Sequence, residues 1–354
     1  MWKFGIHGAL IAVIGPNADA TNMLFGNYNG KASQPVTILE GIKQIAGAGI
    51  AVSYDAGCPL ALKKDGSNNL APGKIAQVVA SAKSADAIIF VGGLDATLEK
   101  EEGNARQDIF EGFSRGDRTQ IELPSPQEDL LKALRATGKP VVFVNCSGST
   151  IAMPWAAKNL PAILQAWYPG EQGGRAVAEV LFGDINPAGR LPITFYRSTA
   201  DLPAFENYSM SNRTYRYFSG KPLFAFGHGL SYTKFKYSSP QLGAASYRPD
   251  DTIKLSFTLQ NTGKYAGDEV PQIYFRHVKS AEPQAKLALC GFTRVHLNKG
   301  QSAAVSIDIL VKNFRYWDTA QKNYVVENGK YELLIGGASD DARLRVTVTI
   351  STPL

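Results

Sequence analysis

The stretch Ala87-Ile-Ile-Phe-Val-Gly-Gly93 runs directly into Leu94-Asp-Ala-Thr-Leu-Glu-Lys-Glu-Glu-Gly103. Its first part is apolar at every position up to Val91, which is typical of a strand buried on both faces of a sheet. Its second part carries the carboxylates of Asp95, Glu99, Glu101 and Glu102. Carboxylates at the C-terminal end of a buried strand lie where open α/β sheets perform their chemistry. The stretch therefore predicts a parallel-sheet domain and makes the acidic loop a candidate functional site.

A solvated acidic loop is the competing interpretation, because most runs of charge are simply hydrated surface. Loop composition alone favours this solvated interpretation, and crowding of like charges is the argument for a function. Such crowding can raise the pKa of one carboxyl group so that this group holds a proton near neutral pH and can donate it.

Short continuous apolar runs bounded by Gly and Pro recur through the first half of the chain. Besides the run at 87–91, they are Leu10–Ile14, Ile50–Tyr54, Val141–Val144, Ile163–Ala166 and the shorter Leu191–Phe195. Apolar residues at helical spacing lie between them, in 38–45, 75–82, 130–134 and 176–181. Ser125 is a good N-cap with Pro126 at N1, and Gly183 is a plausible C-cap. This alternation predicts a layered α/β sandwich with a mostly parallel sheet over residues 1–196.

The second half of the chain has a different pattern. Residues 197–236 are rich in aromatic residues, Gly and Pro and show little periodicity, so we expect a connector there. From residue 237 to 354 apolar and polar residues alternate in short segments separated by turn signals. These segments are Ile253–Leu259, Val270–Phe275, Ala304–Ile309, Tyr331–Ile335 and Leu344–Ile350. Such spacing predicts an all-β sandwich of the immunoglobulin type.

Composition restricts the possible partners. The 354 residues carry a net charge of +6, with −1 in residues 1–196 (17 Lys/Arg, 18 Asp/Glu) and +7 in residues 197–354 (20 against 13). The positive residues are dispersed rather than gathered in a stripe, so we expect no nucleic-acid partner. No run of 18 apolar residues exists, and we expect no membrane span. The apolar run after Met1 reads better as a strand than as a signal peptide, so the sequence assigns no localisation.

Residues that could hold a metal or cofactor are scattered. Cys58, Cys146 and Cys290 are far apart and lack C-x-x-C spacing, which argues against a disulfide framework and structural zinc. No phosphate-binding glycine fingerprint occurs, and we expect neither a metal nor a cofactor. Ser147-Gly148-Ser149 follows a strand but lacks the G-x-S-x-G pattern, which makes a serine hydrolase improbable.

Several longer motifs, in order along the chain, resemble glycoside hydrolase family 3. They are Ile11-Ala-Val-Ile-Gly-Pro-Asn-Ala18, Gly116-Asp-Arg118 to Gln127, Ala166-Trp-Tyr-Pro-Gly-Glu171 with Gly173-Gly174, Val180 to Pro192, Tyr215-Arg-Tyr-Phe218 and Phe224 to Thr233. The resemblance covers nearly the whole chain. It implies a retaining β-glycosidase of the β-glucosidase or β-xylosidase kind, acting on terminal β-linked glucose or xylose of oligosaccharides or glycosides. A full-length enzyme of this kind is compatible with a periplasmic or secreted location.

The family's usual plan has three parts: a (β/α)₈ barrel with the nucleophilic Asp, an α/β sandwich with the acid/base Glu, and a fibronectin type III-like domain. This chain resembles the second and third parts. No Ser-Asp-Trp or Ser-Asp-Tyr sequence, the nucleophile signature, occurs in it. We therefore expect the chain to act with a barrel, in cis or in trans, and to be inactive alone. A non-catalytic carbohydrate-binding or interaction module is the alternative.

The resemblance also directs attention to the acidic loop. Matching Leu98-Glu99-Lys100-Glu101 to the family pattern favours Glu101 as the general acid/base, with Glu102 second and Glu99 third. Asp95 is expected either to orient the loop or to contact the sugar. Asp117-Arg118 is expected to form an ion pair or a backbone clamp.

The aromatic residues of the connector have two interpretations, a sugar-stacking surface or packing that buries them between domains. We favour packing, because aromatic side chains dominate packed interfaces. Trp317 is compatible with either.

Overall fold

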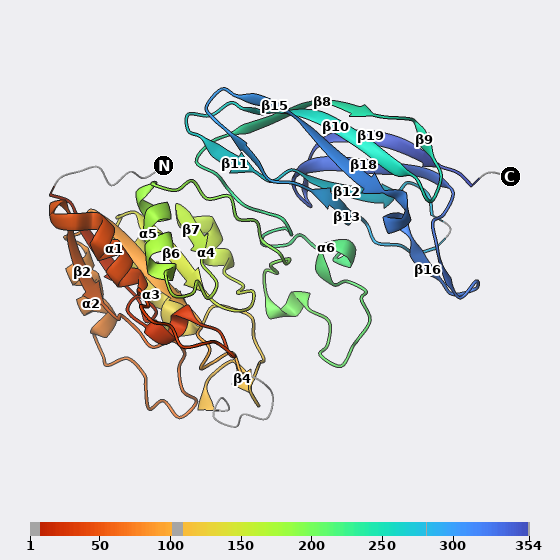
Figure 1. The fold of residues 1–354 in the computed structure, drawn as a ribbon. Helices are drawn as coiled ribbons and strands as arrows, with labels where there is room; N and C mark the ends of the chain where they lie inside the picture. Colours follow the sequence, from red (N-terminus) through yellow and green to blue (C-terminus); the bar gives the residue numbers. More distant parts are fainter. Residues whose placement is uncertain (1–7, 101–108, 281, 353–354) are drawn as a thin grey trace. The chain divides into compact units, whose positions relative to one another are not determined.

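The computed structural model describes residues 8–100, 109–280 and 282–352 (Figure 1). It divides into two compact units. The first comprises Met1–Ile185 and Tyr196–Asp201, and the second Asn186–Phe195 and Leu202–Leu354. The short segments 186–195 and 196–201 thus belong to opposite units. From the sequence we expected the α/β domain to end at residue 196, with a connector over 197–236.

The first unit is built on a five-stranded sheet in the order β2-β1-β3-β6-β7, and every pairing in it is parallel. Its strands are β1 Leu10–Ile14, β2 Ala51–Asp55, β3 Ala87–Gly93, β6 Val141–Cys146 and β7 Ala162–Gln165. All residues of β3 and β6 are buried, as continuous apolar runs in a covered parallel sheet require. The predicted α/β architecture with a parallel sheet is confirmed.

The prediction of a further strand at Leu191–Phe195 is wrong. This segment belongs to the second unit and forms only an isolated bridge, from Phe195 to Phe224. Pro192 cannot donate to a strand ladder, which explains why the apolar run is not used as a strand.

In the described part of this unit, five α-helices accompany the sheet: α1 Ile38–Ala46, α2 Lys74–Ala82, α3 Ser125–Arg135, α4 Pro154–Asn159 and α5 Gly173–Phe182. Thr37 and Glu40 form a reciprocal capping box at the start of α1. Helix α3 begins one residue earlier than predicted, with Pro124 at the N-cap and Ser125 already helical. Gly183 ends α5 in the left-handed conformation, as predicted.

Close packing of α1 against α5 depends on two glycines. A Cβ added to Gly174 would lie 1.9 Å from the Thr37 carbonyl oxygen, and one added to Gly41 would lie 2.2 Å from backbone atoms of Gly174. The two helix backbones therefore approach more closely than any residue with a side chain would permit. This approach packs Ile38, Ile42 and Val177 together in the core of the unit.

We predict that Gly174→Ala lowers the free energy of unfolding of the α/β unit by about 1–3 kcal/mol, because the added methyl group meets backbone that cannot move aside. Gly30→Ala is the matched control, since a Cβ there has nothing within 4 Å. Urea unfolding midpoints would measure both variants. Equal midpoints would contradict the account of the α1–α5 contact.

The second unit is a β-sandwich. One sheet has the order β15-β10-β8 and the other β13-β12-β18-β19-β9. Their strands are β8 Phe235–Leu242, β9 Ser246–Tyr247, β10 Thr252–Asn261, β12 Gln272–His277, β13 Ala288–Phe292, β15 Ser302–Leu310, β18 Gly329–Ala338 and β19 Asp341–Ile350. Short strands β11 Gly267–Glu269 and β14 Val295–Leu297 pair with each other, as do β16 Tyr316–Asp318 and β17 Asn323–Val325.

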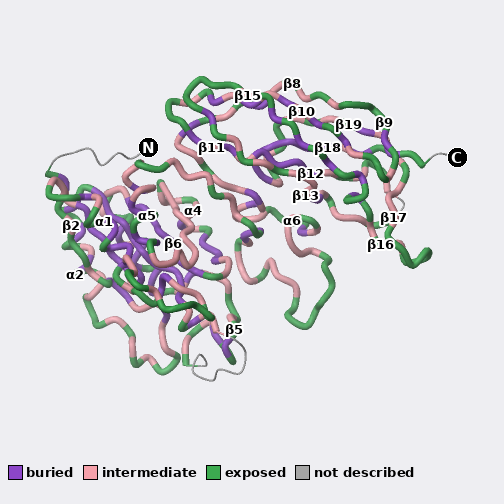
Figure 2. Tube along the Cα trace, in the orientation of Figure 1, coloured by how far each residue is buried: buried purple, intermediate pink, exposed green. Residues whose placement is uncertain are grey.

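Alternation along β10 buries every second residue. Ile253, Leu255, Phe257 and Leu259 are at most 2% exposed and lie in one core with residues of β12, β15 and β18. Figure 2 shows this buried layer within the sandwich. The predicted immunoglobulin-type sandwich is confirmed in its core strands, and β8, β13 and the β16–β17 hairpin are additions that the sequence analysis did not predict.

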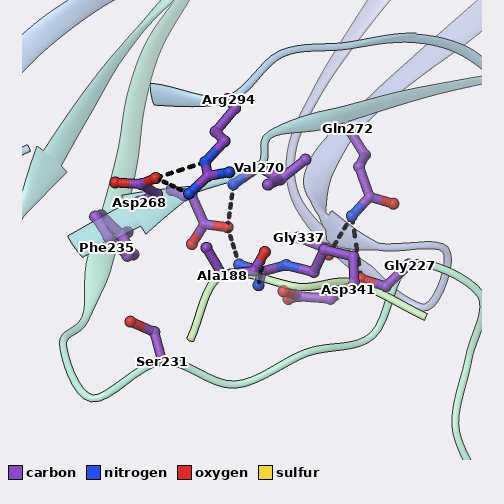
Figure 3. A network of polar contacts seen from close by, with 12 residues as sticks. Ala188, Gly227, Ser231, Phe235, Asp268, Val270, Gln272, Arg294, Gly337 and Asp341 are labelled. Carbon is purple, nitrogen blue, oxygen red and sulfur yellow. Dashed lines mark hydrogen bonds and ion pairs between the residues drawn. The ribbon is translucent and has the colours of Figure 1, made fainter. Parts of the chain in front are cut away.

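A buried ion pair fixes segment 186–195 within the second unit. Arg190 Nη2 lies 2.6 Å from Glu269 Oε1, and both side chains are no more than 10% exposed. Arg190 Nη1 also donates to the carbonyl of Ala188, and the Val270 amide donates to Glu269. Gln272 lies in the same network, bonded to two backbone carbonyls (Figure 3). Removing one partner of such a pair leaves a buried charge uncompensated.

Two further properties concern the described residues as a whole. No helix within residues 8–100, 109–280 and 282–352 is both long and apolar enough to cross a membrane. Cys58, Cys146 and Cys290 are free thiols.

Candidate functional site

The C-terminal ends of three neighbouring strands of the parallel sheet converge on one carboxylate. Glu99 follows β3, Gly148 and Ser149 follow β6, and Tyr168 follows β7. Parallel strands that lie side by side end at the same edge of a sheet, so residues far apart in sequence meet there. This edge carries the beginning of the acidic loop singled out in the sequence.

Both oxygens of Glu99 accept hydrogen bonds from the protein. The Gly148 amide donates to Oε2 at 2.6 Å, the Tyr168 hydroxyl donates to the same oxygen, and the Ser149 hydroxyl donates to Oε1. Asn27 Nδ2 donates to the backbone carbonyl of Glu99 at 2.7 Å. Glu99 is therefore a fixed point from which the chain enters residues 100–108.

Arg118 adds a positive charge beside this cluster. Its Nη1 donates to the Ser149 hydroxyl and to the Thr150 carbonyl, both at 2.7 Å. It is the backbone clamp that the sequence analysis allowed, and the ion pairs of the described residues include none between Asp117 and Arg118. Burial lowers the pKa of Arg118, and the charges of Glu99 and Glu122 oppose that shift. The guanidinium remains charged because its ordinary pKa lies far above neutral pH.

A tight hairpin positions Arg118. Strands β4 Phe113–Ser114 and β5 Asp117–Arg118 pair antiparallel, and the two residues between them, Arg115 and Gly116, both have positive φ. Two consecutive left-handed residues are the signature of a type I′ turn, which matches the twist of a two-residue hairpin.

The ring of Tyr168 fits between two glycines. A Cβ on Gly148 would lie 2.8 Å from Tyr168 Cε2, and one on Gly26 would lie 3.2 Å from Cδ2. The preceding residue, Trp167, has a φ of 57°, a conformation that costs free energy in a non-glycine residue. Burial raises the pKa of Tyr168 and the charge of Glu99 raises it further, so the phenol stays protonated as a donor.

Asp95 is 3% exposed and its carboxylate is engaged by the protein. Its Oδ1 accepts from the Thr97 amide at 2.9 Å and from the Thr97 hydroxyl at 2.6 Å, and its Oδ2 accepts from Asn22 Nδ2 at 2.8 Å. These contacts form a turn at the end of β3. They support the loop-orienting role of Asp95 over a direct contact with sugar.

The structure describes one of the three predicted acid/base residues. Glu99 lies within it, at the edge of the sheet, whereas Glu101 and Glu102 lie outside the described residues. Ser149, Gly148 and Tyr168 were not predicted as partners of Glu99. The available signal was positional, since each follows an apolar run that the sequence analysis had assigned to the same parallel sheet.

A cavity of about 260 Å³ lies beside Arg118. Leu62 and Leu94 contribute apolar surface to its lining, and Glu111, Glu122 and Glu128 contribute carboxylates. Glu122 accepts hydrogen bonds from the Thr199 amide at 2.8 Å and from the Thr199 hydroxyl at 2.6 Å. Burial raises the pKa of Glu122, but these hydrogen bonds outweigh it and the net pKa lies below the ordinary value.

Comparison with protein-family models gives two matches. Residues 7–232 match the glycosyl hydrolase family 3 C-terminal domain, and residues 269–339 match a fibronectin type III-like domain. The chain belongs to glycoside hydrolase family 3. Its parallel sheet, acidic loop and β-sandwich are the C-terminal parts of that family.

Individual relatives agree with the family assignment. The chain is 42% identical to a xylan 1,4-β-xylosidase of Xylanibacter ruminicola, over 77% of this chain and 31% of the relative. It is 34% identical to a periplasmic β-glucosidase of Salmonella typhimurium, over 95% of this chain and 45% of the relative. The solved structure of an Erythrobacter marinus β-glucosidase is similar with a TM-score of 0.80 at 34% identity, over 97% of this chain and 46% of that one. The chain thus spans less than half the length of these relatives.

We predict that Glu99→Gln destabilises the α/β unit of this family 3 chain by about 1–3 kcal/mol. The amide supplies a single acceptor oxygen, and its NH₂ group must face hydrogen-bond donors. Glu111→Gln is the matched control, because Glu111 is exposed. Urea unfolding at pH 7 measures both variants, and an equal effect of the two would contradict the role of Glu99 as a fixed point.

We predict that Thr199→Val lowers stability by about 1–2 kcal/mol at pH 7 and by progressively less as the medium is acidified. The lowered pKa of Glu122 contributes stability above its unfolded value, about 4.3, and this contribution is lost as the pH falls through the folded value. Thr137→Val, which removes a hydrogen bond to the uncharged Leu134 carbonyl, is the control. Its effect should not change between pH 7 and pH 3, and a parallel change in both variants would contradict the assignment.

Proposed function

We propose that this chain is the acid/base-bearing part of a retaining β-glycosidase that hydrolyses terminal β-linked glucose or xylose. Its acidic loop supplies the proton donor, and a barrel, in the same polypeptide or another, supplies the nucleophile. The names of the relatives, β-xylosidase and β-glucosidase, support this substrate class.

The observation that carries the proposal is the attachment of Glu99. Donors that follow two strands, β6 and β7, hold its carboxylate, and Asn27 holds its backbone carbonyl. A catalytic group must be held close to its productive geometry, and a loop achieves this only when its ends are fixed. Glu101 and Glu102 lie two and three residues after this anchored residue in the sequence.

The same hydrogen bonds bear on the choice among the three glutamates. A general acid must direct a proton at the leaving oxygen. Glu99 already accepts from three protein donors, so its oxygens are engaged as acceptors. We therefore propose Glu101 as the acid/base, keep Glu102 as the second candidate, and assign Glu99 a positioning role.

The proposed chemistry requires a second carboxyl group. In a retaining enzyme two carboxyl groups lie about 5–5.5 Å apart across the glycosidic bond. One attacks the anomeric carbon, and the other protonates the leaving oxygen and later removes a proton from the attacking water. Arg118 lies beside Glu99, where its positive charge would balance the carboxylates of the loop.

The proposal is tested in a chimera in which this chain replaces the matching segment of the Xylanibacter ruminicola relative. We expect turnover of aryl β-xylosides or β-glucosides, and we expect Glu101→Gln to lower kcat/KM about 10²–10⁴-fold for substrates with poor leaving groups. The loss should be much smaller with a dinitrophenyl leaving group, which needs little protonation. A purely structural defect would reduce both rates equally.

Two controls distinguish Glu101 from Glu102 and test whether the chain is active without a barrel. Glu102→Gln should retain the leaving-group dependence of the parent chimera. The isolated chain should show no turnover above the background rate. Full activity of the Glu101→Gln chimera on poor leaving groups, or turnover by the isolated chain, would contradict the proposal.

The cavity beside Arg118 favours a second candidate function, that of a non-catalytic carbohydrate-binding module. Carboxylates, a guanidinium and three leucines are among its lining, and such a mixture can bind the hydroxyls and the C–H surface of a single sugar ring. Titration with xylo- and gluco-oligosaccharides distinguishes the two functions. Binding that is unaffected by Glu101→Gln and Glu102→Gln, together with an inactive chimera, would favour the module.

A further inference from the structure

The β-sandwich unit carries an exposed aromatic hairpin that no catalytic role explains. Strands β16 and β17 pair through Tyr316–Val325, Trp317–Tyr324 and Asp318–Asn323. Figure 1 shows this hairpin projecting from the end of the sandwich, and Figure 2 shows its tip as exposed. Trp317 is 52% exposed and Tyr324 is 57% exposed.

The two rings form a compact unit. Trp317 and Tyr324 lie directly opposite each other across the hairpin, with ring centroids 5.2 Å apart and an angle of 75° between the planes. A cross-strand aromatic pair stabilises a hairpin. That stabilisation accounts for the contact between the rings, but it does not require half of each side chain to remain in water.

A cation completes this face of the hairpin. The Arg315 guanidinium carbon lies 5.0 Å from the centroid of the Tyr324 ring. Side chains alternate along a strand, so Arg315 and Trp317 are on one face and Tyr316 is on the other. Within the described residues, no carboxylate lies within ion-pair distance of Arg315.

The charge of the hairpin is positive overall. Residues 311–325 contain three cations, Lys312, Arg315 and Lys322, against the single carboxylate of Asp318. Asp318 is occupied within the turn, where it accepts from the Ala320 and Gln321 amides at 2.9 Å. Tyr316 lies on the opposite face of the hairpin. Burial raises its pKa, and the carboxylates of Glu327, Asp318 and Glu282 raise this pKa further.

We propose that Arg315, Trp317 and Tyr324 form a binding site for a β-linked oligosaccharide that carries an acidic branch such as a uronic acid. The C–H face of a sugar ring packs on an exposed aromatic ring, and a guanidinium binds a carboxylate through two parallel hydrogen bonds. The two rings, 75° apart, offer apolar surface for one sugar unit, and the Arg315 guanidinium lies over the Tyr324 ring. The choice of a saccharide rests on the proposed function, whereas the site itself is distinct from the acidic loop.

Isothermal titration of the whole chain tests this inference with two probes: a xylo-oligosaccharide bearing one glucuronic acid branch, and the same oligosaccharide without the branch. We expect the branched probe to bind more tightly, and its affinity to fall as the salt concentration rises. Trp317→Ala should weaken binding of both probes about tenfold or more, and Arg315→Gln should weaken only the branched probe, by about tenfold. Tyr208→Ala, which removes an aromatic side chain that is 91% exposed elsewhere in the unit, is the matched control and should change neither affinity.

Three results would overturn the inference. They are equal affinity of both probes in the wild-type chain, unchanged affinity in both Trp317→Ala and Arg315→Gln, and a concentration-dependent dimer that is lost in Trp317→Ala without any saccharide binding. Unfolding midpoints of the variants equal to that of the wild type show that the hairpin, and not the fold, is tested. Binding through the hairpin alongside an inactive chimera would support this site and refute the proposed function, while the converse result would refute this site alone.

Discussion

The hydrogen bonds to the Glu99 carboxylate are the interactions on which the arrangement at the C-terminal edge of the parallel sheet depends. Donors from the segments after β6 and β7 converge on a residue that follows β3, so a single side chain joins the ends of three strands. The sheet alone fixes where those strands end, but it leaves the following loops free to diverge. A shared carboxylate, with Arg118 holding Ser149 from the other side, draws the loops into one constellation. The glycines at 148 and 26 are necessary for the same reason, because a side chain at either position would displace the Tyr168 ring.

This arrangement separates two tasks that the acidic loop would otherwise combine. Carboxylates that hold a structure together must remain ionised and paired, whereas a proton donor must be able to change its charge. The oxygens of Asp95 and Glu99 accept hydrogen bonds from protein donors, which gives these two residues a structural role. In the function that we propose, the glutamates that follow them in the sequence supply the proton. The division matches a general feature of enzyme sites, in which supporting groups hold the reacting groups within a fraction of an ångström of their productive positions.

Much of the fold could be predicted from the sequence, and the reasons are physical. The buried strands β1, β3 and β6 could be predicted because a parallel sheet covered on both faces requires uninterrupted apolar residues. Strand β10 could be predicted because apolar and polar residues must alternate in a half-buried strand. The strand predicted at Leu191–Phe195 was wrong because local apolarity does not determine which sheet, if any, a segment joins. Pro192 argued against a strand there, because proline has no amide hydrogen to donate to a neighbouring strand. In the site, carboxylates were found from their crowding. Tyr168 and Ser149 were missed because their partner lies 69 and 50 residues away, and such pairings are set by strand order, which no local pattern encodes.

The exchange of segments between the two units has a consequence for how such proteins can be recombined. Residues 186–195 lie in the second unit and residues 196–201 in the first, so the chain passes from one to the other three times. Arg190 in the exchanged segment forms an ion pair with Glu269, whose side chain is almost fully enclosed. A genetic crossover between residues 190 and 269 would therefore join an arginine from one parent to a glutamate from another. Recombined proteins should fold chiefly when both parents carry the same charge pair. Positions 190 and 269 should therefore be inherited together despite their separation in the gene.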